Sequence, residues 1–135
     1  MFSDFQKNLS TEFMEYKAWG FKYSVYNTSS YQVDLCCIKK GGYSSIHHHE
    51  YRTNIFLVLK GILNINLYPR IKADLQDCMT YTIGDGQKTR KFKIKPKIIH
   101  QFNAVTEVQL LEIYYTVCSD KDIVRQDQGG VNYEE

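Results

Sequence analysis

The sequence contains little proline and glycine, with 2 Pro and 8 Gly in 135 residues. Because 43% of the residues are hydrophobic and 24% are charged, the composition excludes a collagen-like or largely disordered chain. The longest apolar run, residues 55–59, is too short to cross a bilayer. The net charge is only +2, so no strong positive field attracts nucleic acid. We therefore expect one compact, soluble domain with neither a nucleic-acid nor a membrane partner.

Cysteine motifs are also lacking. The four cysteines form no CxxC pair, which is the spacing that zinc knuckles need. Cys36 and Cys37 are adjacent on a predicted strand and point to opposite faces, and Cys78 and Cys118 stand alone, so we expect free thiols. The first ten residues have no basic segment followed by an apolar one, as a secretory signal would. The expected location is the cytoplasm.

Alternating apolar and polar residues, typical of β-strands, recur along the chain. The predicted strands are 21–26, 32–38, 53–60, 62–68, 79–83, 90–94, 100–104 and 108–116. We expect 53–60 and 62–68 to form a hairpin at Lys60-Gly61, and only 11–17 has a helical pattern. This spacing favours an all-β sandwich or barrel of antiparallel strands, with a short N-terminal helical or irregular segment. One domain over 1–135 is expected, with its core at about 19–117 and a polar tail at 118–135 that forms a turn of helix and a mobile end.

The four histidines are the most informative residues, because three of them are consecutive. On an extended chain His47 and His49 project from the same face and His48 from the other. His100, on a distant predicted strand, could complete a set of three. Neutral imidazoles are ligands for Zn²⁺, Fe²⁺, Ni²⁺ or Mn²⁺, so the pattern indicates a candidate metal site.

The residues around this cluster follow a known spacing: Gly41, five residues, His47, one residue, His49, four residues, Asn54, six residues, Gly61. This resembles the first motif of the cupin superfamily, in which the last ligand position holds a glutamate instead of Asn54. The resemblance implies a metal held by both histidines, with a weaker, neutral amide in the position of the carboxylate.

A second stretch resembles the second cupin motif more loosely, with Gly84-Asp85, Pro96 and His100 followed by Gln101-Phe102. The usual glycine between the proline and the histidine is missing. Together the two stretches imply a single cupin (jelly-roll) β-barrel. Its metal ligands would be His47, His49, His100 and Asn54, and its cofactor a divalent ion of unknown identity, or none.

Two groups of cupins are similar at the edges of the chain. Lys17-Ala18-Trp19-Gly20 and Asp122-Ile123-Val124-Arg125 resemble segments of the cupin domain of type II mannose-6-phosphate isomerases. Nucleotide-sugar 3,4-ketoisomerases also keep the HxH pair with an amide near the glutamate position, and they work without metal. In that chemistry His47 or His49 would act as acid and base. The arginine that commonly precedes the HxH pair there is absent, and Tyr43-Ser44-Ser45-Ile46 occupies its place.

Further candidate site residues come from strand faces and charge. Glu112 and Tyr114 share one face of the last long strand, and we expect them to be catalytic together with His47 and His49. The expected substrate-binding residues are Tyr43, Arg52, Gln101 and Arg125, of which the arginines suit a phosphate.

The functional hypothesis is an isomerase or epimerase of a sugar, a sugar phosphate or a nucleotide sugar, with a divalent metal as Lewis acid. Three alternatives stay open: a metal-free ketoisomerase, a cupin that binds metal or sugar without catalysis, and a three-histidine iron dioxygenase. The predicted partners are a carbohydrate substrate and a second copy of the chain, since strand edges favour a homodimer.

Overall fold

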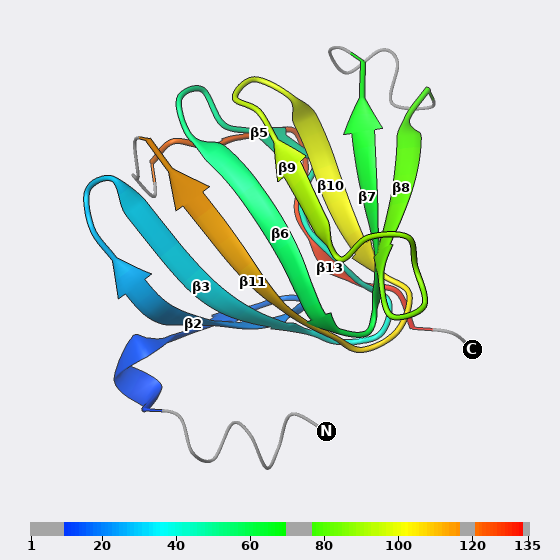
Figure 1. Cartoon of the computed structure of the whole chain (residues 1–135), viewed down its shortest axis with the longest axis horizontal. Helices are drawn as coiled ribbons and strands as arrows, with labels where there is room; N and C mark the ends of the chain where they lie inside the picture. Colours follow the sequence, from blue (N-terminus) through cyan, green and yellow to red (C-terminus); the bar gives the residue numbers. More distant parts are fainter. Residues whose placement is uncertain (1–9, 70–76, 117–120, 134–135) are drawn as a thin grey trace.

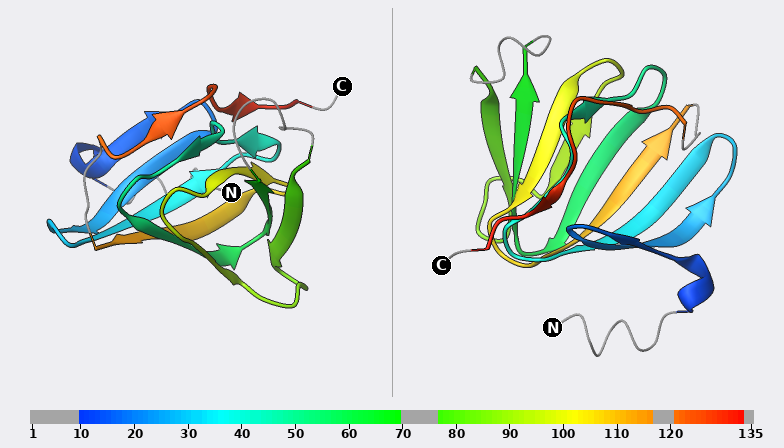
Figure 2. Two further views of the ribbon diagram at one scale, coloured as in Figure 1. Left: turned by 90° about the horizontal axis from the view of Figure 1, so that it is seen from above. Right: turned by 180° about the vertical axis from the view of Figure 1, so that it is seen from behind.

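The computed structural model describes residues 10–69, 77–116 and 121–133. These residues form two antiparallel sheets that pack face to face (Figure 1; Figure 2, left). The all-β prediction is confirmed. No helix within the described ranges is long and apolar enough to span a membrane.

The first sheet has six strands and forms the front layer in Figure 1. In spatial order they are β1 (Met14–Lys17), β2 (Gly20–Asn27), β3 (Tyr31–Ile38), β11 (Val108–Tyr115), β6 (Thr53–Lys60) and β9 (Lys91–Ile94). The short 3₁₀ helix η1 (Thr11–Phe13) precedes β1, so the helical pattern predicted for 11–17 is correct only for its first turn.

The second sheet is built around β10, which pairs with β7 on one edge and with two short strands on the other. Its strands are β8 (Met79–Gly84), β7 (Ile62–Tyr68), β10 (Ile99–Ala104), β5 (His47–His48), β4 (Gly42–Tyr43), β12 (Val124–Arg125) and β13 (Gly130–Val131). β12 lies beside β5 and β13 beside β4, so the C-terminal segment extends this sheet (Figure 2, right). The expected helical turn and mobile end are wrong for 121–133, which is tied to the sheet by backbone hydrogen bonds.

The predicted hairpin between 53–60 and 62–68 is also wrong. β6 pairs with β11 and β9, whereas β7 pairs with β10 and β8, so the chain crosses from one sheet to the other at Gly61. Gly61 has a φ of 97°, and a Cβ there would overlap the carbonyl oxygen of Glu107. Only glycine allows this corner, because a side chain would be both strained and blocked.

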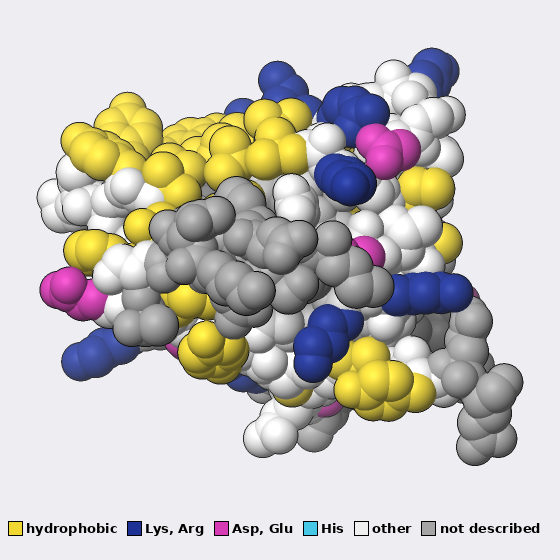
Figure 3. Space-filling model, turned by 90° about the horizontal axis from the view of Figure 1, so that it is seen from below, with side chains coloured by type: hydrophobic (Ala, Val, Ile, Leu, Met, Phe, Trp, Pro, Cys, Tyr) yellow, Lys and Arg dark blue, Asp and Glu magenta, His cyan; other side chains and the backbone are white. Residues whose placement is uncertain are grey.

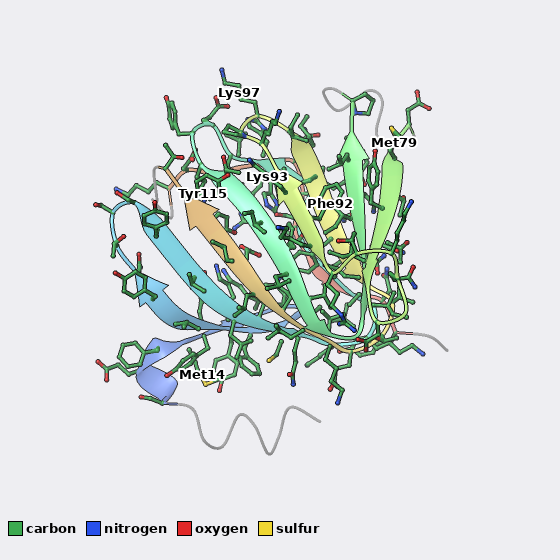
Figure 4. The ribbon with its side chains drawn as sticks, in the orientation of Figure 1. Met14, Met79, Phe92, Lys93, Lys97 and Tyr115 are labelled. Atoms are coloured by element: carbon green, nitrogen blue, oxygen red, sulfur yellow. The ribbon has the colours of Figure 1, made fainter. Side chains whose placement is uncertain are left out.

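Side chains alternate between the core and the outer faces of the sheets. On β9, Phe92 and Lys93 point to opposite sides, and Lys93 lies over the ring of Tyr115 on the outer face (Figure 4). The core cluster consists of Trp19, Cys36, Ile38, Phe56, Val58, Leu63, Ile65, Ile83, Ile94, Phe102, Ala104, Val108 and Leu110. Cys36 and Cys37 are buried free thiols and Cys78 is also free, as expected, while Cys118 lies outside the described residues.

The inner faces of the long strands change from apolar to polar along their length. On β11 the buried residues run from Leu110 to Glu112 and Tyr114. Across the sheet Leu110 is paired with Val58, and Tyr114 is paired with Asn54. Hydrophobic contacts therefore hold one end of the sandwich together, and buried polar groups occupy the other.

Some apolar side chains remain exposed. Val25, Tyr26 and Tyr31, on β2 and β3, are each more than half exposed. Hydrophobic side chains gather along one edge of the face drawn in Figure 3. Such a surface is compatible with a second copy of the chain, and the homodimer stays a prediction.

Candidate metal centre

Two paired strands, β5 and β10, and the loop that follows β5 bring the histidines together at the polar end of the sandwich. His47 on β5 and His100 on β10 are cross-strand neighbours in the second sheet. His49 follows β5 and lies on the same side as His47. The ring centroids are 4.4 Å apart for His47 and His100, 5.0 Å for His47 and His49, and 5.5 Å for His49 and His100.

Each of these rings is oriented by a backbone carbonyl. The Nδ1 of His47 lies 2.8 Å from the oxygen of Ser45, that of His49 lies 2.6 Å from Asp122, and that of His100 lies 2.8 Å from Ile98. A carbonyl oxygen only accepts hydrogen bonds, so each Nδ1 carries the hydrogen and each Nε2 keeps its lone pair. The Nε of Arg52, which can only donate, also lies 3.2 Å from the Nδ1 of His49, but the contact of that Nδ1 with the Asp122 carbonyl is much shorter and decides the tautomer. This is the arrangement typical of histidines that bind metal through Nε2.

The free nitrogens converge on one point. One ligand atom from each histidine lies within 4.8 Å of the others. The Nε2 atoms of His49 and His100 are buried and have no hydrogen-bond partner among the described residues. Buried polar atoms normally have a partner, so these two nitrogens fit a metal ion as the missing one. The donor set suits the borderline divalent ions that imidazole prefers.

All three imidazoles are neutral at pH 7. Burial lowers the pKa of His49 to about 3, and the nearby Arg52 guanidinium adds to the effect. Burial likewise lowers the pKa of His100 to about 4, and that of His47 to well below its usual 6.5. Metal ligands must be unprotonated, so the site needs no proton release to bind an ion at neutral pH.

His48 points to the other side, as the alternation predicts. Its Nε2 lies 2.7 Å from a carboxylate oxygen of Glu50, outside the three-histidine group. The three histidines of the group are buried, at 7% exposure or less.

Asp122 is a positioning residue that the sequence reasoning missed. Its carboxylate accepts hydrogen bonds from the backbone N–H groups of Glu50, Tyr51 and Arg52, and its carbonyl orients His49. Burial raises the pKa of Asp122, but the three N–H groups outweigh this effect and the net shift is downward. The C-terminal segment therefore holds the loop that carries His49. The sequence drew attention to Asp122-Ile123-Val124-Arg125 as a terminal segment, but nothing in it marks a residue that binds backbone 70 positions away.

A cavity of about 480 Å³ adjoins the histidines. His47 lines it, whereas His49 and His100 are more fully buried. Four cationic side chains but only two carboxylates line the cavity, so it favours anions; these residues are Lys17, Lys22, Arg52, Arg125, Glu15 and Glu112. The remaining lining comes partly from the C-terminal segment at Ile123, Gln128 and Gly129.

A buried charge cluster forms one wall of the cavity. Lys22 lies 3.1 Å from the carboxylate of Asp34, and Glu112 is the cross-strand neighbour of Asp34. Burial raises the pKa of Glu112, although the positive charge of Lys22 opposes the shift. Burial lowers the pKa of Lys22, but the charges of Glu112 and Asp34 outweigh it and raise the pKa overall.

Five of the ten predicted site residues line this cavity, namely His47, Arg52, Glu112, Tyr114 and Arg125. Tyr114 lies beside His49, with ring centroids 5.5 Å apart, and the guanidinium of Arg52 lies 3.8 Å from the centroid of the Tyr114 ring. Arg125 donates a hydrogen bond to the hydroxyl of Ser45, which lies 3.0 Å from Nδ1 of His47. Asn54 is on the inner face of β6 and is 1% exposed.

Two predicted substrate-binding residues lie elsewhere. Gln101 follows His100 on β10 and therefore faces outward, where its amide bonds the carbonyl of Ser44 and the hydroxyl of Tyr68. The ring of Tyr43 packs against Gly130. Neither residue lines the cavity, so the structure gives no support to a contact with substrate.

Solved structures share this architecture. No protein-family model and no curated protein matches the sequence. KdgF from Halomonas sp. is 15% identical with a TM-score of 0.59, covering 74% of this chain and 80% of its own. Oxalate decarboxylase from Bacillus subtilis is 12% identical with a TM-score of 0.67, covering 84% of this chain and 29% of its own. CapF from Staphylococcus aureus is 20% identical with a TM-score of 0.65, covering 83% of this chain and 33% of its own.

These neighbours are cupin-fold proteins, and the chain therefore has the cupin fold. This confirms the fold that the spacing of Gly41, His47, His49 and Gly61 implies. The chain spans about a third of the length of oxalate decarboxylase and CapF. The chain therefore combines the cupin fold with a three-histidine group that is suited to a divalent metal.

The first prediction concerns Asp122. Replacing it with alanine leaves three backbone N–H groups without their acceptor, so we expect a loss of about 2–4 kcal/mol in the free energy of unfolding. Metal affinity should also fall, by about tenfold or more, because His49 loses its fixed orientation. Urea denaturation and calorimetric metal titration measure the two effects, with Asp77→Ala, an exposed aspartate, as control. An Asp122→Ala protein as stable as the control would contradict the role assigned to this residue.

The second prediction concerns acid stability. The pKa values of His49 and His100 are lower in the folded protein than the 6.5 of an unfolded chain. Unfolding therefore takes up protons below pH 6.5, and stability that is complete above this pH is lost as the pH falls. Each of the two histidines should contribute a slope of about 1.4 kcal/mol per pH unit.

This slope is measured on metal-free protein by urea denaturation between pH 6 and pH 5. His100→Gln should reduce the slope of the unfolding free energy with pH by the contribution of one histidine. His48→Ala should leave the contribution of His100 to this slope unchanged. A wild-type stability that stays constant over this interval would show that the rings are not buried in neutral form.

Proposed function

We propose that the protein is a metal-dependent isomerase or epimerase that acts on a sugar, a sugar phosphate or a nucleotide sugar. The observation that carries the proposal is the position of His47, His49 and His100 beside a positively charged cavity of about 480 Å³. That volume is typical of pockets for small molecules. Lysine and arginine side chains suit a phosphate or carboxylate group on the substrate.

The three histidines would hold the ion, which when bound polarises the carbonyl and neighbouring hydroxyl oxygens of the sugar. Arg125 is the best placed of the cations to hold the anionic group. Its described side-chain contact is with a hydroxyl, that of Ser45, and not with a carboxylate. Arg52 is held against Tyr114 and forms the opposite part of the lining.

Glu112 suits the proton transfer. Its pKa is raised by burial, which brings this carboxyl closer to the range in which a general base both accepts and returns a proton near neutral pH. In the proposed reaction Glu112 takes the proton from the carbon next to the carbonyl, and the electrons of that C–H bond move onto the carbonyl oxygen. An epimerase returns the proton to the other face of the same carbon.

An isomerase instead returns the proton to the former carbonyl carbon, while a hydroxyl proton passes to the former carbonyl oxygen. Tyr114 lies two residues from Glu112 on the same face of β11 and lines the same cavity. Its hydroxyl is the group that we assign to this second transfer.

Two structural neighbours support the proposed class of substrate. CapF is described as a capsular polysaccharide assembling protein, and oxalate decarboxylase is named for a small anion. The carbohydrate and the anionic character of the substrate are proposals for the present chain.

The third prediction tests the metal. His49→Ala should bind Mn²⁺ or Zn²⁺ at least about 100-fold more weakly than wild type, because one of three ligands is lost. His48→Ala is the matched control, since His48 is adjacent in sequence but points away from the group. Titration calorimetry on protein stripped with chelator gives both affinities. A wild type that binds neither ion yet is stabilised by a nucleotide sugar would favour the metal-free ketoisomerase.

The fourth prediction tests the chemistry. Metal-loaded protein incubated in D₂O with a panel of sugar phosphates and nucleotide sugars should introduce deuterium next to the carbonyl of its substrate. Glu112→Gln should slow this exchange by about 10²- to 10⁴-fold without changing metal affinity. Glu107→Gln, a glutamate outside the cavity lining, is the control. Absence of exchange with every compound would contradict the isomerase and favour a binding cupin.

A further inference from the structure

A dense group of positive charges lies along residues 86–97. This segment holds six of the chain's 17 basic side chains and none of its 15 acidic ones. Arg90 pairs with Asp85 at 2.8 Å, and the other five form no salt bridge with the described residues. None of them lines the cavity or belongs to the histidine group. We call this set the cationic edge; its members, all exposed, are Lys88, Arg90, Lys91, Lys93, Lys95 and Lys97.

The cationic edge follows β9, the last strand of the first sheet. Within the described ranges β9 pairs only with β6. Just before β9, the N–H of Val58 donates to the carbonyl of Arg90. Hydrogen-bonded pairs recur at every second residue of an antiparallel ladder, so they continue at Phe92 and Ile94. The backbone groups of the residues in between therefore point away from β6, to the free edge of the sheet.

These residues in between are Lys91 and Lys93. The N–H of Lys91 donates to the hydroxyl of the nearby Thr89 at 3.2 Å, as expected for a group that has no acceptor on β6. Lys93 extends its side chain over the ring of Tyr115, with Nζ 5.9 Å from the centroid (Figure 4). Lys93 therefore presents a backbone donor, a backbone acceptor and a cation at one position. A strand edge of this kind is a template for one more strand.

Charge decides which strand can be added. Lysines on an edge strand repel a second copy of the same edge and so prevent aggregation. The same lysines attract a strand that carries carboxylates, because cross-strand neighbours of opposite charge stabilise a sheet. Nucleic acids and anionic polysaccharides would also neutralise the charges, but they have no regular row of backbone amides to match the edge.

We propose that β9 is a docking site for an acidic peptide segment of a partner protein, which binds in an extended conformation and adds a strand to the first sheet. Because alternate residues of a strand share one face, carboxylates at every second position of the segment would lie beside Lys91 and Lys93. This inference is independent of the proposed function, since it uses no residue of the metal site or the cavity.

The first test measures affinity with a fluorescent eight-residue peptide of alternating glutamate and threonine, by anisotropy. Lys91→Gln/Lys93→Gln should bind this peptide at least about tenfold more weakly than wild type, because the two charges that face the carboxylates are lost. Lys39→Gln/Lys40→Gln is the matched control. It removes the same charge from exposed positions between β3 and β4, and it should change the affinity by less than about twofold.

The second test separates strand pairing from simple charge attraction by hydrogen exchange at individual amides, followed by NMR. In the peptide complex the N–H of Lys93 should exchange at least about tenfold more slowly than in the free protein, because it gains an acceptor. The N–H of Phe92, which is bonded within the sheet, is the internal control and should not change. Polyacrylate, which has carboxylates but no amides, should leave the exchange of Lys93 unchanged.

Three results would overturn the proposal. The first is a wild type that does not bind the peptide, and the second is a Lys91→Gln/Lys93→Gln protein that binds it as tightly as wild type. The third is peptide binding without slower exchange at Lys93, since the charges would then act without strand pairing. Both double variants should keep the metal affinity of wild type, so a failure here leaves the proposed function standing, and a failure of that function leaves this test unaffected.

Discussion

The polar end of this protein depends on three hydrogen bonds from imidazole Nδ1–H groups to backbone carbonyls, made by His47, His49 and His100. They fix the tautomer of each ring and direct the lone pairs of Nε2 toward a common point. Because these acceptors belong to the backbone, the orientation of the rings depends on the fold as a whole. Three neutral rings held in this way form a preorganised group that is suited to a divalent ion.

The two sheets make that arrangement possible. Hydrophobic contacts at one end, among residues such as Leu110 and Val58, hold the sheets together. The stability they supply allows the other end to bury groups that have no hydrogen-bond partner among the described residues, including Asn54 and the Nε2 atoms of two histidines. The same strands therefore serve both purposes, and their inner faces change from apolar to polar on the way to the site.

The C-terminal segment completes the centre. β12 and β13 extend the second sheet, and Asp122 binds the loop after β5 through three backbone N–H groups. The segment also lines part of the cavity, so the shape of the cavity and the position of His49 depend on the same few residues. A change in this segment would alter the cavity and the three-histidine group together.

The sequence predicted the long strands and the histidine set because both follow from local periodicity. Alternation along 108–116 gave β11 and its inward residues Glu112 and Tyr114, and the spacing of His47 and His49 put them on one face. Prediction from the sequence failed where the structure depends on pairing between strands that are far apart in the chain. The corner at Gly61 looked like a hairpin because two strands meet at a glycine, and strands as short as β4, β5, β12 and β13 have too few residues for a pattern.

The role of Asp122 could not be predicted from the sequence, because it depends on hydrogen bonds to backbone groups about 70 positions away. Gln101 is next to His100 on β10, and adjacent residues on a strand face opposite sides, so the cavity beside the histidines does not include Gln101.

The central claim is the neutral Nδ1–H state of the three rings. It can be measured directly by ¹⁵N NMR of the imidazole side chains in metal-free protein at pH 7, with long-range proton correlations to identify the protonated nitrogen. The account predicts a protonated Nδ1 and an unprotonated Nε2 for His47, His49 and His100, followed by a shift or broadening of all three Nε2 signals when a divalent ion is added. Protonated Nε2 atoms, or rings charged at this pH, would contradict it.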